Sequence, residues 1–317
     1  MTAETKAEPI AGVVSMADAA ERLVRFEEVT ALRVPKYRMR HDLRVRSQQE
    51  AVDFINDVGI ALLFPGDNLP LPDLWTAING GQRPIPKHHY DRALSRTWEW
   101  KDSIPMHKQA WYGKLIRGKP AFVALDDLPA LYALSNNYGE LDDYLEAYAD
   151  GLLSKEAKDI YEVLLAEGPM PTSRLRKAAG MAGGGDNARR FDRAIAELQT
   201  DLKIVKSGIS DSNRWKYCYV YDLLLRWAPD LGRQARRYTT RSAMRHLIGR
   251  YLWASIAAPV HLFSRLFGWD PGVTERVVGE MLQDGTLHAI RVVGGPGPTP
   301  RTKAPAEGEV WVTHLDF

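Results

Sequence analysis

The chain has 317 residues, of which 45% are hydrophobic and 26% charged, so it can bury a sizeable core in two or three domains. No apolar run approaches the roughly 20 residues that cross a bilayer, and the start of the chain lacks the pattern of a secretory signal. The single cysteine, Cys218, excludes an internal disulfide and a cysteine-based zinc cluster. We therefore expect a cytoplasmic protein.

Charge is unevenly distributed along the chain, although the formal net charge is only +2. Residues 121–167 hold eleven Asp or Glu and two Lys, whereas residues 168–217 hold ten Lys or Arg against five acids. Residues 226–265 contain eight arginines and one acid, Asp230. A field of one sign on certain faces attracts a polyanion, whatever the net charge. Solvated helix faces are the alternative explanation for any single cluster.

The first half of the chain predicts a disordered tail over 1–14 and an aromatic-rich domain over 15–150. The tail is small, polar and aperiodic. Ser15 and Ser47 each begin a capping-box pattern, which predicts one helix from Ser15 to about Thr30 and another that ends at Gly59. Residues 131–148 are acidic and also predict a helix.

Residues 151–230 show the clearest periodicity in the chain. Apolar residues from Ala157 to Leu164 fall on one helical face. The expected order is helix, helix, helix, strand, turn, strand, which is the winged-helix order. The expected elements are helices from Ser154 to Gly168, Thr172 to Ala179 and Asp186 to Leu202, and strands Lys203–Gly208 and Lys216–Asp222.

The same order recurs in residues 231–317, with a long Pro- and Gly-rich wing loop over 294–308. This loop is either a flexible arm into DNA or a disordered insertion. We expect an α+β, mainly α fold of tandem winged-helix units with small β-hairpin wings, and a divergent winged helix is one interpretation of 15–150. The elements expected in 231–317 are helices over 244–252, 260–267 and 271–281, and strands Leu287–Val293 and Val310–Leu315.

Basic side chains lie where a winged helix would meet DNA. Its third helix presents an outer face to a groove while the hairpin touches the backbone, and each phosphate contact adds sequence-independent affinity. A solubilising surface is the alternative. The candidates in 151–230 are Arg174, Arg176, Lys177, Arg189, Arg190, Arg193, Arg214 and Lys216; in 231–317 they are Arg237, Arg241 and Arg245, which we expect to form a stripe along one helix.

Trp98-Glu99-Trp100-Lys101-Asp102 is the segment that best suggests chemistry. Carboxylates among indole rings could have raised pKa values, and Glu99 or Asp102 could orient water toward a sugar. Trp98, Trp100 and Trp111 are candidates for stacking on a base. A core strand with Glu99 and Lys101 exposed is the alternative. The adjacent His88 and His89 lack partners at metal-ligand spacing, so we expect no metal site.

Five segments of the sequence carry a likeness to a known family: Phe191–Ala194, Glu197–Gln199, Lys203–Val205, Trp215–Tyr221 and Arg245–Tyr251. Together they resemble the AlkZ-like family of bacterial DNA glycosylases, which are built from tandem winged helices. The likeness covers roughly residues 150–293. It implies excision of alkylated or cross-linked bases from double-stranded DNA by a monofunctional mechanism without a cofactor.

That family uses a Gln-x-Gln or Gln-x-Asp motif in its first unit to position the hydrolytic water, and residues 15–150 of this sequence contain no such motif. Gln48 and Gln49 are adjacent, so their side chains point about 100° apart on a helix, and we expect both to face solvent. Three functions therefore remain open: a glycosylase, a non-catalytic DNA-binding protein or transcriptional regulator, and a protein-interaction module. No coiled-coil heptads are present, and we expect a monomer.

Overall fold

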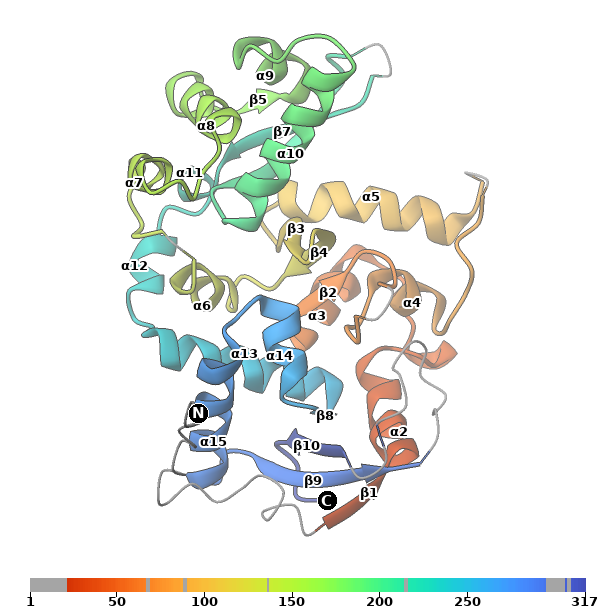
Figure 1. The fold of residues 1–317 in the computed structure, drawn as a ribbon. Helices are drawn as coiled ribbons and strands as arrows, with labels where there is room; N and C mark the ends of the chain where they lie inside the picture. The colour runs from red at the N-terminus through yellow and green to blue at the C-terminus, as the bar shows by residue number, and fades with distance from the viewer. Residues whose placement is uncertain are drawn as a thin grey trace, which may run out of the picture.

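The structure is a computed structural model that describes residues 22–66, 69–87, 90–135, 137–213, 216–294, 306 and 309–317. Its fold is α+β and mainly α, as expected (Figure 1). The expected tail and the Ser15 cap lie outside the described residues. In the described part of the chain, no helix has both the length and the apolar character needed to span a membrane.

Residues 48–123 form what we term the N-terminal unit. Ser47 caps its first helix by accepting a hydrogen bond from the Glu50 amide, and Gly59 ends that helix at a φ of +77°. The three strands form an antiparallel sheet in the order β2-β4-β3. The elements are α3 Gln48–Val58, β2 Ile60–Leu62, α4 Leu74–Asn79, α5 Arg92–Met106, β3 Trp111–Ile116 and β4 Lys119–Val123.

Residues 155–223 form the central unit. The helical face predicted from Ala157 to Leu164 is buried in its core, and Ser154 caps the first helix. Cys218 is buried on the last strand, as expected of a packed thiol. The sheet order is β5-β7-β6. The elements are α8 Lys155–Glu167, β5 Met170–Pro171, α9 Thr172–Ala178, α10 Asp186–Thr200, β6 Ile204–Ser210 and β7 Cys218–Leu223.

Residues 240–313 form the C-terminal unit, at the opposite end of the molecule from the central unit (Figure 1). Asp270 caps its third helix and Pro271 is the first helical residue, as the sequence predicts. The elements are α13 Thr240–Ser255, β8 Ala257–Ala258, α14 His261–Phe267, α15 Pro271–Gln283, β9 His288–Val293 and β10 Glu309–Thr313.

A strand from the start of the described chain completes the C-terminal sheet, whose order is β1-β9-β10-β8. The expected helix from Ser15 to Thr30 is therefore wrong over residues 22–25 and confirmed over residues 26–30. Residues 22–25 are strand β1, which pairs in parallel with β9, and only then does helix α2 (Phe26–Lys36) begin. Leu23 is exposed and Val24 buried, an alternation of period two that a helical pattern does not explain.

All three units share one order: helix, strand, helix, helix, strand, strand. In each sheet, the last strand lies between the first and the second. The segment 131–148 is two helices rather than one, because Asp143 Oδ2 accepts hydrogen bonds from the amides of residues 138–140 and holds a turn between them. The connecting elements are a short 3₁₀ helix His41–Leu43, α6 Leu128–Ala133, α7 Asp143–Ala149, α11 Leu224–Trp227 and α12 Leu231–Ala235.

A buried ionic contact fixes the N-terminal unit against the C-terminal unit. The Asp127 carboxylate is 2% exposed and lies 2.7 Å from His246 Nε2 and 3.0 Å from Arg250 Nε. Arg250 also donates a hydrogen bond of 2.6 Å to the Asn56 carbonyl at the end of α3. The approach is so close at Gly59 that a Cβ there would lie 2.7 Å from Asp127 Oδ2. The three polar groups thus link α3, α6 and α13.

Replacing Asp127 by Ala should lower the free energy of unfolding by about 3 kcal/mol, because it leaves Arg250 without its counter-ion in a partly buried site. Urea denaturation measures this change. Asp126→Ala is the matched control, since Asp126 is exposed and its loss should change stability by less than about 0.5 kcal/mol. Equal losses in the two variants would contradict the assignment.

Candidate functional site

Two side chains singled out from the sequence, Trp98 and Asp102, lie one turn apart on α5, where this helix packs against β6 of the central unit. The segment around them is helical, so the alternative of a core strand is wrong. Lys101 is buried rather than exposed, at 2%. The helix is the third of the N-terminal unit, and Asp91 caps it through the Leu94 amide.

The Lys101 ammonium is held inside this junction by three oxygen atoms. It donates to Tyr217 Oη at 2.6 Å, to Tyr219 Oη at 2.8 Å and to Asp102 Oδ1. The Tyr217 hydroxyl in turn donates to the Asp102 carboxylate at 2.9 Å. A buried cation is tolerated only when it is paired and hydrogen-bonded in this way. We call Lys101, Asp102, Lys206, Tyr217 and Tyr219 the junction cluster.

The phenol of Tyr217 remains protonated near neutral pH. Burial raises the pKa of Tyr217 well above its ordinary value, and hydrogen bonding to Tyr219 and the Asp102 charge raise it further. Burial likewise raises the pKa of Tyr112, which lies beside the cluster on β3. The hydroxyl of Tyr217 can therefore donate a proton to a hydrogen bond at any pH near neutrality.

The carboxylate of Asp102 is 12% exposed and makes its hydrogen bonds to a lysine and a phenol, not to indole rings. Glu99, the other candidate, is exposed and makes no hydrogen bond or ion pair within the described part of the chain. Of the two carboxylates, only that of Asp102 is held in a fixed position. The geometry therefore favours Asp102 for any chemical role.

The three candidate stacking residues lie in different surroundings. Trp98 is 44% exposed, and its ring centroid lies 5.5 Å from that of Phe64 and 5.3 Å from Lys101 Nζ. Trp100 and Trp111 are 5% and 0% exposed and lie in the hydrophobic core. The expectation that these two stack on a base is wrong for this conformation, because burial of an apolar ring outweighs its aromatic character in deciding where it lies.

The expectation that Gln48 faces solvent is wrong, because its side chain is half-buried and hydrogen-bonds to two other polar side chains. Its amide nitrogen donates to Gln109 Oε1 at 2.8 Å, and its oxygen accepts from the Ser103 hydroxyl at 2.7 Å. Gln49 is exposed, as predicted, and donates to Asp53. The contact with α5 draws Gln48 inward.

On the central unit, the third-helix cations differ in how far they are neutralised. Arg189 is 76% exposed and 3.6 Å from Asp186. Arg190 is paired with Glu156 at 2.6 Å, whereas Arg193 is exposed and has no ion-pair partner among the described residues. Of the others, Arg174 pairs with Glu167, Arg176 donates to the Gly183 carbonyl, Lys177 and Lys216 are exposed, and Arg214 lies outside the described residues.

The expected stripe of three arginines is wrong. Helix α13 begins at Thr240, so Arg237 lies in the turn before it. Arg241 and Arg245 are on the helix but face α15, where they pair with Glu280 at 3.2 Å and Asp284 at 2.6 Å. Glu280 on α15 and Asp284 at its C-cap thus neutralise two arginines of α13. Arg301, Lys303 and most of the wing loop lie outside the described residues, as do His88 and His89.

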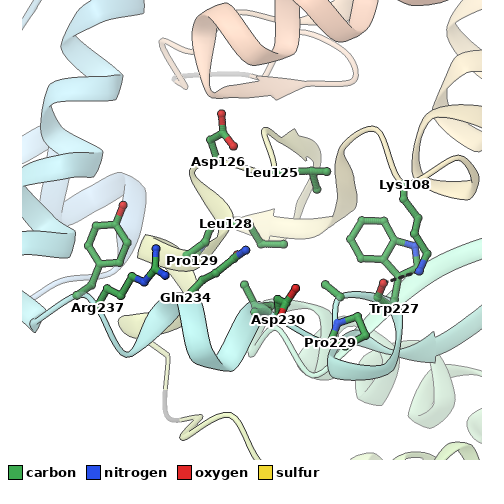
Figure 2. Close-up of a pocket in the computed structure, with 13 residues that line it drawn as sticks. Lys108, Leu125, Asp126, Leu128, Pro129, Trp227, Pro229, Asp230, Gln234 and Arg237 are labelled. Atoms are coloured by element: carbon green, nitrogen blue, oxygen red, sulfur yellow. Dashed lines mark hydrogen bonds between the residues drawn. The ribbon is translucent and has the colours of Figure 1, made fainter.

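Arg237 instead lines a pocket of about 520 Å³ between the segment that precedes α6 and the residues around α12 (Figure 2). Lys108 closes one side, donating to the Trp227 carbonyl at 2.7 Å. Asp126 and Asp230 supply acidic groups to the same rim, so its charge is mixed. Among the described residues, no three His, Cys, Asp or Glu side chains gather as a metal site would require.

Sequence reasoning missed Lys101, Lys206 and the two tyrosines as functional candidates. The signal for the tyrosines is their spacing: residues 219 and 221 alternate along β7, residue 217 continues that spacing just before the strand, and neighbouring rings are in contact. Nothing in the local sequence pairs β7 with α5, which lies about 115 residues earlier. The junction is a product of packing between units.

No curated protein and no solved structure shows significant similarity to this chain. A family model described as AlkZ related matches residues 45–268. The match begins just before α3 and ends just after α14, so it includes the N-terminal unit, the central unit and the junction cluster between them. It covers more than half of the chain, which therefore belongs to the AlkZ-related family.

Proposed function

We propose that this protein is a DNA-binding repair protein of the AlkZ glycosylase type, built from three winged helices. The family match over 45–268 is the observation that carries the proposal. The shared element order and strand order of the three units support the winged-helix part of it. In such a unit the third helix enters a groove and the hairpin contacts the backbone.

The third helix of the central unit, α10, is the best candidate for DNA contact. Its exposed face carries Arg189 and Arg193. Arg189 lies 3.6 Å from Asp186, and Arg193 has no ion-pair partner among the described residues. On α15 of the C-terminal unit, Glu275 and Glu280 surround Arg276, and the nearby arginines of α13 are already paired. Free cations release counterions on binding phosphate, whereas paired cations contribute less.

Replacing Arg193 by Gln should weaken binding to every duplex sequence by a similar factor and reduce the slope of log K against log salt by about 1. Fluorescence anisotropy over a series of salt concentrations measures both quantities. Arg25→Gln removes the same charge from an exposed arginine on β1, at the far end of the molecule (Figure 1), and should change neither. Unaltered binding by the Arg193 variant would exclude α10 as the DNA-contact helix.

For base excision, we propose Asp102 as the carboxylate that acts on the sugar. Trp98 and Asp102 are four residues apart and share a face of α5. A base displaced from the duplex could stack on the exposed Trp98 ring. The carboxylate one turn away would then orient a water molecule and stabilise the positive charge that develops on the sugar as the N-glycosidic bond breaks.

Asp102→Asn should reduce release of an N7- or N3-alkylated purine from a duplex by about 100-fold or more, because the amide keeps the shape but neither attracts a cationic sugar nor accepts a proton. Glu99→Gln on the same helix should retain activity, since Glu99 has no fixed contact among the described residues. Base release under single-turnover conditions measures the effect, with duplex affinity as the check on folding. Equal rates for wild type and Asp102→Asn would remove Asp102 from the mechanism.

The second candidate function is non-catalytic DNA binding, as in a transcriptional regulator. The observation that favours it is the lack of a Gln-x-Gln or Gln-x-Asp motif in residues 15–150, which precede the central unit; the Gln-x-Asp match Gln199-Thr200-Asp201 lies at the end of α10. Under this alternative, the Arg193 variant still weakens duplex binding, but the wild-type protein releases no alkylated or cross-linked base. The two experiments together distinguish the functions.

A further inference from the structure

Helix α7 and the turns beside it carry a row of exposed apolar side chains at the outer edge of the molecule (Figure 1). The row, which we call the apolar stripe, contains Leu141, Leu145, Tyr148 and Leu152, exposed to 43%, 48%, 40% and 55%. Their spacing of four, three and four residues is that of one helical face. Single exposed apolar residues are ordinary on a protein surface, but a contiguous row of them marks a contact surface.

The opposite face of α7 is fixed to the core of the central unit. Tyr144 and Ala147 are buried there, and the Tyr144 ring packs on that of Tyr161 with their centroids 4.6 Å apart. Asp143 holds the turn before the helix by accepting hydrogen bonds from three backbone amides. The apolar stripe is therefore presented to solvent by a helix that is held in place from behind.

A row of carboxylates runs beside the apolar stripe. Its members are exposed, follow one another at intervals of four residues and have no ion-pair partner among the described residues: Asp142, Glu146 and Asp150. The ammonium of Lys158 lies 5.4 Å from the Tyr148 ring centroid, but this lysine is already paired with Glu162 at 2.6 Å. The surface thus combines apolar contact area with uncompensated negative charge.

This combination selects among the molecules that could cover the apolar stripe. Uncompensated carboxylates repel phosphates, so neither a nucleic acid nor an anionic lipid surface matches it. A second copy of the chain is also disfavoured, because a two-fold interface uses the same patch on both subunits and would bring the two rows of carboxylates together. A protein segment with apolar residues and positive charge fits, since it can cover the stripe and pair with the carboxylates.

We propose that the apolar stripe docks an amphipathic helix of a partner protein, whose apolar residues recur every three or four positions and are bordered by lysines or arginines. Such a helix buries its apolar side against Leu145 and Tyr148 at the centre of the stripe, where truncation of a side chain costs most in an interface. Its basic side chains lie opposite the row of carboxylates and set its orientation. This docking does not rest on the function proposed above.

Peptide selection on the intact protein tests both the apolar and the basic part of the proposal. Randomised peptides of about 15 residues, roughly four helical turns, are displayed on phage and selected on the wild-type protein, and the enriched sequences are synthesised for anisotropy measurements. We expect them to combine apolar residues at helical spacing with lysine or arginine, and to bind more weakly as salt rises. Leu145→Gln and Glu146→Lys should each weaken binding by about ten-fold or more. Leu32→Gln and Glu28→Lys make the same changes at exposed positions of α2 and should bind as wild type.

Thermal unfolding of each variant serves as the check on folding, and because Leu145 and Glu146 are exposed, the midpoints should agree with that of the wild type. Enriched peptides without basic residues, equal binding by Leu145→Gln, or failure to enrich any peptide overturns the proposal. Sedimentation velocity tests a second copy as the occupant. Self-association of the wild-type protein that Leu145→Gln abolishes would show that another copy of this chain covers the stripe, and would also overturn the proposal.

Discussion

The buried ammonium of Lys101 is the interaction on which the junction between the N-terminal and central units depends. A lysine at 2% exposure requires acceptors, and they come from a carboxylate on its own helix, the Tyr219 phenol on β7 and the Tyr217 phenol just before that strand. Because the hairpin of the central unit supplies two of these acceptors, it packs on α5, the third helix of the N-terminal unit. The same docking buries Lys206 between two rings and holds Asp102 one turn from Trp98. The lysine that holds the two units together and the carboxylate proposed for chemistry therefore lie in the same cluster.

The pairing of arginines with acidic side chains in the fold distinguishes the three units more clearly than the sequence does. The central unit contains six arginines and the C-terminal unit seven, but Arg241 and Arg245 of α13 pair with acids of α15 and its C-cap. Arg193 on α10 keeps its charge uncompensated by the described residues. An asymmetric arrangement of this kind suits a protein that holds a polyanion mainly at one end, because only unpaired cations displace counterions.

Local structure was largely predictable from the sequence, and contacts between units were not. Periodicity and capping located the helices that begin near Ser154 and Pro271 to within a residue or two, since these signals are local. Helices α13 and α15 could be anticipated, but not that Arg245 turns toward Asp284. The burial of Trp100 and Trp111 and the inward turn of Gln48 likewise depend on tertiary packing, which a linear pattern does not encode.

The ionisation of Lys206 tests the central claim, that packing between the N-terminal and central units forms a desolvated junction. With the lysines labelled at Cε, carbon-detected chemical shifts can be followed through a pH titration of the intact protein, and the Lys206→Met variant assigns the signal. The account predicts a midpoint near 7 for Lys206. A midpoint near the ordinary lysine value of 10.5 would show that this amine is solvated and charged, and would contradict the account.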